Sequence, residues 1–120
     1  MEANNPPLDD YVSAPEQVYK WEVLSNLTKK SFYGNTLYVL NVTSLEWLDT
    51  EQATGVNGKL WTHLVTVAVP KNLKFTNVSY ALVTGGSNVI PNNMMNYKDD
   101  QLWEIDIVAH YSQAVAISIQ

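Results

Sequence analysis

The sequence predicts an α/β domain built on a mixed sheet, in which antiparallel strands are followed by a β–α–β unit. Two observations predict it. Residues 60–69 are rich in β-branched and aromatic side chains and end at Pro70, as a strand would. Later, an apolar run at 80–83 ends in the glycine loop 85–88, and a segment with helical spacing leads to a second apolar run at 115–119. A crossover between parallel strands needs about a dozen residues or more, and this stretch provides them.

The N-terminal part is expected to be a loose leader followed by a short helix and a strand. The 120 residues, 46% of them hydrophobic, are enough for one domain with a core. Within that domain, 1–120, residues 1–13 are expected to be an extended leader. The run from Ser13 to Glu16 has the pattern of a capping box, which predicts a helix that begins there. Alternating residues predict a strand over 20–28, and a helix that continues through Leu24 is the alternative.

The next two strands are expected to pair antiparallel. Residues 36–43 follow a turn at 32–35, and a loop at 49–58 with the turn signal Asn57-Gly58 leads into 60–69. In the first strand we expect three apolar side chains to face the core and Asn41 to face outward. The three are Tyr38, Leu40 and Val42.

The C-terminal part is expected to form the β–α–β unit, with the right-handed crossover that such units almost always have. The run at 80–83 is apolar on both faces, which is typical of a strand buried in a covered sheet. Carboxylates favour a helix N-terminus, and here they are Asp99, Asp100 and Glu104. The apolar residues with helical spacing are Leu102, Ile105 and Ala109. A final strand over 114–120 completes the unit.

Charge and composition exclude several classes of function. The net charge is −5 and the seven Lys and Arg form no basic stripe, so we expect no nucleic-acid partner and no binding to anionic membranes. No run approaches the roughly 18 apolar residues of a membrane span, so no membrane insertion is expected. The absence of cysteine removes disulfides, thiolate nucleophiles and cysteine-bound zinc.

Three glycosylation sequons favour a secreted protein. They begin at Asn26, Asn41 and Asn77, although an asparagine-rich chain would carry roughly one or two by chance. The residues after Met1 are polar and show no signal-peptide pattern. Met1 is therefore either a start placed on a mature N-terminus or a true cytosolic start. We expect an extracellular location.

Side chains that could carry chemistry are few. His63 and His110 lie far apart in the sequence without a carboxylate cluster, so structural roles are expected and no metal site. The chain contains no nucleophile-elbow, phosphate-loop or zinc-protease motif, and no cofactor is predicted. Ser87 is not placed as a nucleophile. The four tryptophans are scattered, and packing is the expected role for most of them rather than a carbohydrate platform.

The loop Gly85-Gly86-Ser87-Asn88 has the best functional interpretation. After a strand and before a helix, glycines allow backbone amides to point into a site, as half of an oxyanion hole. The alternative is an ordinary turn. We expect Gly85 and Gly86 to need positive φ and to lie at the carboxyl end of the strand at 80–83, where ligands bind in such sheets.

A family resemblance rests on motifs along nearly the whole chain. Its most specific parts are Trp61-Thr62-His63 and Gly85-Gly86-Ser87-Asn88. The other parts are Leu8 to Pro15, Tyr19-Lys20-Trp21, Tyr38 to Ser44 with Trp47, and Val67 to Pro70. With these motifs the chain resembles the N-terminal part of the PhoPQ-activated pathogenicity-related protein family, which includes a secreted proliferation repressor of social amoebae.

The resemblance implies an incomplete hydrolase fold. Members of that family are several times longer and resemble α/β-hydrolases of the peptidase type, with the catalytic serine, acid and histidine downstream. It therefore implies that residues 1–120 form an incomplete α/β-hydrolase-like N-terminal region that lacks a complete catalytic site. The expected partners are the remainder of the parent polypeptide and a cell-surface receptor.

Three functions stay open at this point. The first is the N-terminal portion of a secreted hydrolase-like glycoprotein that represses cell proliferation. The second is part of an active serine peptidase or esterase. The third is a small stand-alone binding module. A serine-elbow motif beyond Gln120 would favour the second, and a stop codon there would favour the third.

Overall fold

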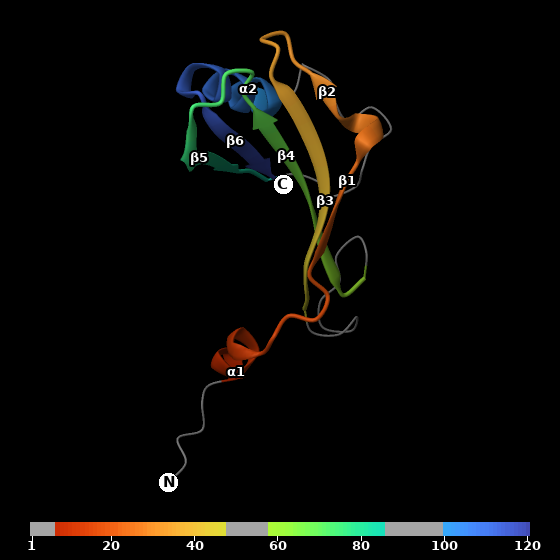
Figure 1. Cartoon of the computed structure of the whole chain (residues 1–120). Coiled ribbons are helices and arrows are strands. Elements are labelled where there is room, and N and C mark those ends of the chain that lie inside the picture. Colours follow the sequence, from red (N-terminus) through yellow and green to blue (C-terminus); the bar gives the residue numbers. More distant parts are fainter. Residues whose placement is uncertain (1–6, 48–57, 86–99) are drawn as a thin grey trace.

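The computed structural model describes residues 7–47, 58–85 and 100–120, which form one mixed sheet with helices at its two ends (Figure 1). The helices are α1 (Pro7–Ser13), the 3₁₀ helix η1 (Ser25–Leu27) and α2 (Asp100–Ser112). The strands are β1 (Lys20–Val23), β2 (Lys29–Lys30), β3 (Thr36–Glu46), β4 (Leu60–Val69), β5 (Phe75–Val83) and β6 (Ala114–Ile119). The strand order is β1-β3-β4-β6-β5, and β2 also pairs with β3.

The central hairpin confirms the prediction of two antiparallel strands. β3 and β4 pair from Thr36 opposite Val69 to Glu46 opposite Leu60. β4 has the predicted bounds, and Pro70 ends it because proline has no N–H for the ladder. The turn before β3 also forms, with Gly34 at φ +81, a left-handed conformation that glycine adopts without strain.

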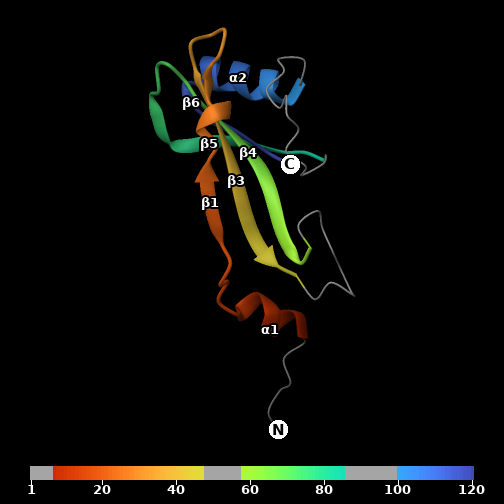
Figure 2. The ribbon, with the colours of Figure 1, turned by 90° about the vertical axis from the view of Figure 1, so that its right-hand side faces the viewer.

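The predicted inner face of β3 is wrong. Leu37 and Val39 are fully buried, whereas Tyr38 is 38% exposed. α2 lies across the sheet (Figure 2), and its apolar side chains pack against Leu37 and Ala68. Tyr38 alternates with Leu37 along β3, so it lies on the other face. Both faces of this strand carry apolar residues, so the two-residue period of a strand did not identify which face is covered. Asn41 shares the face of Val39 and is half-buried rather than directed outward.

The N-terminal predictions need two corrections. Residues 7–13 were expected to be extended but form α1, and the helix ends at Ser13 instead of beginning there. Pro7 and the carboxylates Asp9 and Asp10 occupy its first turn, which is where a helix favours them. The predicted strand over 20–28 is shorter, because η1 follows β1 directly. The alternative, a helix through Leu24, is wrong as well.

The β–α–β unit is confirmed. β5 and β6 are parallel, from Ser79 opposite Val115 to Val83 opposite Ile119, and α2 connects them along the chain. The predicted helix face is buried: Leu102, Ile105 and Ala109 are all at most 6% exposed. β6 lies between β4 and β5, antiparallel to β4.

β5 is not the buried strand that its sequence predicts. All of its residues except Leu82 are exposed. The strand is at the edge of the sheet and pairs only with β6 among the described strands. An apolar run at a sheet edge leaves main-chain groups and side chains available for further pairing.

A buried polar network joins α2 to the turn before β3. Asn35 is fully buried, and its Nδ2 donates to Asp106 Oδ1 at 2.8 Å and to the Asp106 carbonyl at 3.1 Å. Its Oδ1 accepts from the Lys71 N–H at 3.0 Å, and the Asn35 N–H donates to Ser31 Oγ at 3.2 Å. Asp106 is 1% exposed, and its Oδ2 has no hydrogen-bond partner among the described residues. One asparagine side chain therefore holds a helix, a turn and the start of a loop together.

Tyr80 gives a pH-dependent link between β5 and α2. Its hydroxyl donates to Glu104 Oε1 at 2.7 Å, and this hydrogen bond, with smaller contributions from burial and the carboxylate charge, raises the Tyr80 pKa. The folded state therefore favours the neutral phenol. Its stabilising contribution is complete below the pKa of an unfolded tyrosine and is lost as pH rises through the higher folded value.

We expect Glu104→Gln to lower the Tyr80 pKa toward its ordinary value. Titration of ¹³C-labelled tyrosine by NMR resolves each of the seven tyrosines and measures this shift. Glu22→Gln on β1 is the matched control and should leave the Tyr80 titration unchanged. An identical Tyr80 titration in wild type and Glu104→Gln would contradict the link.

Candidate functional site

The candidate oxyanion loop begins where β5 ends, beside the end of β6. The Thr84 N–H donates to the Ile119 carbonyl at 2.9 Å, and the Thr84 hydroxyl donates to the same oxygen at 3.3 Å. These bonds fix the backbone directly before Gly85, which lies two residues past the last residue of β5. Gly86, Ser87 and Asn88 lie outside the described residues.

Gly85 does not need glycine for its backbone conformation. The described glycines with positive φ are Gly34 and Gly58, so the predicted positive φ at Gly85 is wrong. A Cβ built on Gly85 would meet no atom within 4 Å. The position is exposed and open, so a side chain placed there would occupy the space from which another group could approach the main chain.

A second group of polar atoms lies at the β3–β4 bulge, on the face opposite α2. His63 Nε2 is 2.9 Å from Ser44 Oγ, and His63 Nδ1 is 3.1 Å from the Gln120 main-chain oxygen. Both ring nitrogens of His63 thus have hydrogen-bond partners. Beside them is a cavity of about 290 Å³, lined by Ser44, Leu45, Trp47, Trp61 and His63.

The sequence did not reveal the pairing of Ser44 with His63. The register of β3 against β4 shifts between Thr43 and Leu45, which makes Ser44 the extra residue of a β-bulge. A bulge changes the direction of a side chain relative to the ladder, and no period in the sequence indicates one. The motif Trp61-Thr62-His63 drew attention to this region, but it did not indicate that Ser44 would be the partner of His63.

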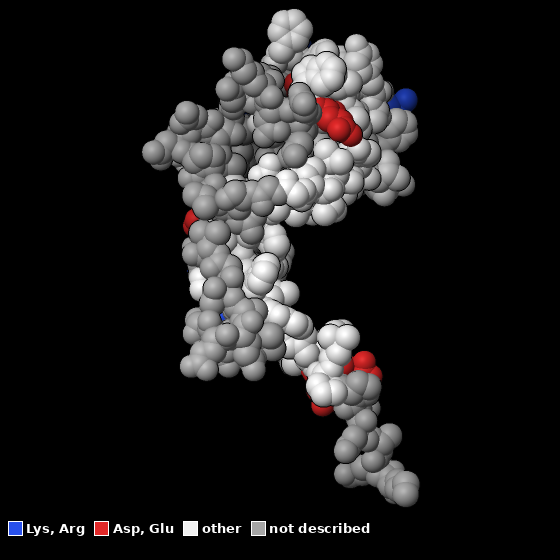
Figure 3. Space-filling model, turned by 180° about the vertical axis from the view of Figure 1, so that it is seen from behind, with Lys and Arg blue, Asp and Glu red and all other residues white. Residues whose placement is uncertain are grey.

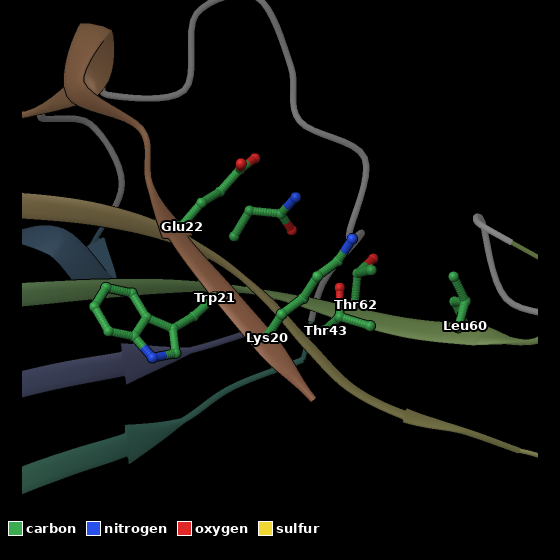
Figure 4. Close-up of a pocket in the computed structure, with 7 residues that line it drawn as sticks. Lys20, Trp21, Glu22, Thr43, Leu60 and Thr62 are labelled. Carbon is green, nitrogen blue, oxygen red and sulfur yellow. The ribbon is translucent and has the colours of Figure 1, made fainter. Parts of the chain in front are cut away.

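A second cavity, the hollow beside β1, lies on the opposite face of the same hairpin from the first. Figure 4 shows this hollow beside β1. It measures about 410 Å³ and is lined by Lys20, Trp21, Glu22, Asn41, Thr43, Leu60 and Thr62. Figure 4 shows the Lys20 and Glu22 side chains on one side of β1 and the Trp21 ring directed away from them. The hollow is open and mixed in polarity, and it holds no pair of groups placed for acid–base chemistry.

The sequon asparagines lie at different degrees of exposure. Asn26 in η1 and Asn77 in β5 are exposed. Asn41 is half-buried and lines the hollow beside β1. None of the three is buried, so each side chain has some access to solvent.

The remaining candidate residues have varied surroundings. His110 stacks on Tyr33, with 4.6 Å between the ring centroids, in the last turn of α2. Trp21 and Trp103 are 58% and 56% exposed, so packing does not account for these two, whereas Trp47 and Trp61 line the cavity at the bulge. In the described part of the chain no three His, Cys, Asp or Glu side chains gather as a metal site would require.

Few basic groups are visible on the face of the molecule that Figure 3 shows. Seen from behind, acidic atoms lie near α2 and on α1, few Lys or Arg atoms are visible, and most of the described surface is uncharged (Figure 3). Among the described helices none is long and apolar enough to cross a membrane.

The comparison with known proteins decides the family. Residues 8–120 match the family described as PhoPQ-activated pathogenicity-related protein. The chain belongs to this family. It is also 34% identical over 115 residues to Autocrine proliferation repressor protein A of Dictyostelium discoideum. The aligned region covers 93% of this chain and 21% of that protein. No solved structure matches the chain.

This PhoPQ-activated pathogenicity-related chain thus spans about a fifth of the length of the relative it matches. The match confirms the family resemblance that the motifs indicated, and it extends through every described element. The mixed α/β sheet confirms the coarse fold class. The assignment of Gly85, Gly86, Ser87 and Asn88 to an oxyanion loop of a hydrolase stays a prediction.

Proposed function

We propose that this chain is the N-terminal portion of a secreted, hydrolase-like glycoprotein that acts as an extracellular signal and represses cell proliferation. The observation that carries the proposal is the 34% identity to Autocrine proliferation repressor protein A. An autocrine factor acts on the cells that release it, so it must reach the outside of the cell. On this proposal the partner is a cell-surface receptor.

A growth assay tests the proposal. The full polypeptide that carries residues 1–120 is purified and added to cultures of Dictyostelium discoideum over a range of concentrations, and cells are counted until saturation. We expect a dose-dependent increase in doubling time. The control is the same protein after heat unfolding. Unchanged growth at every concentration of the folded protein would reject the proposal.

The edge strand β5 supports a second partner, the remainder of the parent polypeptide. β5 is exposed and has one described neighbour, so a further strand would satisfy its free edge. We expect residues 1–120, expressed alone, to self-associate through this edge. Light scattering after size-exclusion chromatography measures the mass, and Val83→Lys should shift it toward the monomer. A monomer with a cooperative thermal transition would argue against this partner.

The second candidate function is a serine peptidase or esterase. Its support is topological: β5 leads through Gly85 toward α2, and an α/β-hydrolase takes one oxyanion-hole amide from such a strand-to-helix loop. On this reading the catalytic serine, acid and histidine lie outside the described residues. Hydrolysis of ester and peptide substrates by the full polypeptide would test it. The third candidate, a stand-alone binding module, has no observation in its favour.

Glycosylation gives a separate prediction for the secreted form. We expect Asn26 and Asn77 to carry glycans when the protein is made in a secretory host, because both side chains are exposed. Asn41 should carry a glycan less often, since it is half-buried in the hollow beside β1. Peptide mass spectrometry before and after glycosidase treatment measures the occupancy of each site. Unmodified Asn26 and Asn77 would contradict the glycoprotein proposal.

A further inference from the structure

We propose that Ser44 is a reactive serine, activated by His63, that accepts an acyl group from small uncharged esters. This site is separate from the proposed hydrolase centre near Gly85, because it uses the β-bulge of β3 and the face of the sheet opposite α2. The bulge places the Ser44 side chain on the same face as His63. Both side chains are half-buried, so they are fixed by their surroundings yet border an open cavity.

The hydrogen bonds bring the Ser44 hydroxyl within reach of the His63 ring. His63 Nδ1 faces the Gln120 main-chain oxygen at 3.1 Å, and a main-chain oxygen can only accept, so Nδ1 carries a hydrogen. In the resting arrangement the Ser44 hydroxyl donates to the Trp61 carbonyl at 3.1 Å. His63 Nε2 is 2.9 Å from Ser44 Oγ, so the hydroxyl has only to turn from that carbonyl for its proton to face the lone pair on Nε2.

The oxygen that fixes the imidazole is itself held in the sheet. The Gln120 N–H donates to the Leu64 carbonyl at 3.0 Å, next to His63 in β4. A base whose second nitrogen donates to a fixed acceptor is the arrangement that orients histidine in serine hydrolases. Here a main-chain oxygen takes the place of the usual carboxylate.

The cavity indicates the class of substrate. Besides Ser44 and His63 its lining residues are Leu45, Trp47 and Trp61, all of them apolar or aromatic. The Trp61 indole Nε1 is buried and has no hydrogen-bond partner among the described residues. An ester with a small aryl or alkyl group matches this lining.

The proposed reaction is an acyl transfer to Ser44. Ser44 Oγ forms a bond to the ester carbonyl carbon while its proton moves to His63 Nε2. The resulting oxyanion collapses, the bond to the leaving oxygen breaks, and the proton on Nε2 passes to that alkoxide. Water then attacks acyl-Ser44, with His63 again taking and returning the proton, which releases the acid and regenerates the hydroxyl.

An alkyl fluorophosphonate tests the site, because it labels an activated serine without needing a known substrate. The full polypeptide is incubated with the probe, and the modified peptide is identified by mass spectrometry. We expect the label on Ser44 and none after Ser44→Ala. His63→Gln should slow labelling of Ser44 by about 100-fold or more, since a general base contributes roughly that much. Ser79→Ala, at an exposed serine on β5, is the matched control.

Three results would overturn the proposal: no label on Ser44 in folded protein, label only on another serine, or undiminished labelling of Ser44 in folded His63→Gln. Label on a serine elsewhere would leave the proposed hydrolase centre intact, so the two proposals fail separately. If His63→Gln does not fold, His63→Phe replaces it. This variant keeps an aromatic ring at the position and removes the base, so labelling of Ser44 should again fall by about 100-fold or more.

Discussion

Asn35→Ala is expected to lower the free energy of unfolding by about 3 kcal/mol or more. The substitution removes the amide that donates to Asp106 Oδ1 and accepts from the Lys71 N–H. Asp106 is 1% exposed and its other oxygen already lacks a partner among the described residues, so the whole carboxylate would be left without hydrogen bonds. Leaving a buried carboxyl group without hydrogen-bond partners costs more than losing an exposed hydrogen bond.

Urea unfolding followed by circular dichroism measures this loss. Asn26→Ala is the matched control, since it removes an asparagine that is exposed in η1, and it should change the free energy of unfolding by less than about 0.5 kcal/mol. A second variant, Asp106→Leu, removes the carboxylate with its cost of burial and should destabilise less when combined with Asn35→Ala than the two changes added together. A loss below about 1 kcal/mol for Asn35→Ala would show that the network does not hold α2 in place.

The sequence predicted the elements with the clearest patterns. β4 has the predicted bounds because β-branched residues fill it and Pro70 cannot continue it. α2 shows the predicted buried face because Leu102, Ile105 and Ala109 are spaced for one side of a helix. These signals depend on residues close together in the sequence, so they hold regardless of how the rest of the chain folds.

The β3–β4 pairing and the β–α–β unit formed as predicted, but several other predictions that depended on tertiary contacts failed. β3 has apolar residues on both faces, and only the packing of α2 on Leu37 decides which face is inside. β5 has the sequence of a buried strand, yet it lies at the sheet edge, pairs only with β6 among the described strands and is mostly exposed. The capping-box residues from Ser13 to Glu16 begin no helix, because α1 starts at Pro7 and ends at Ser13.

The candidate site was predicted only in part, for the same reason. Glycine after a strand is a local signal, and Gly85 does follow β5. The pairing of Ser44 with His63 joins residues 19 apart through a bulge, and the partner of His63 Nδ1 is 57 residues away at Gln120. Neither the bulge nor the position of β6 beside β4 can be derived from spacing, because both depend on how the strands assemble.

Gly85→Val is expected to lower hydrolytic turnover of the full polypeptide by on the order of 100-fold, if the proposed hydrolase centre exists. A valine side chain at Gly85 would occupy the open space beside the main chain at the end of β5. An oxyanion could then no longer approach amides in this loop, and removal of one oxyanion donor typically costs about that much.

Folding should change little in this variant. The φ of Gly85 is not in the left-handed region, and an added Cβ meets no atom within 4 Å, so the backbone here accepts a side chain without strain. Steady-state hydrolysis of ester and peptide substrates, measured beside thermal unfolding, separates the two effects. Gly85→Ala is the graded control and should lose less activity, since its side chain is smaller. Turnover that is unchanged in Gly85→Val, or that falls only together with the melting temperature, would make this loop an ordinary turn.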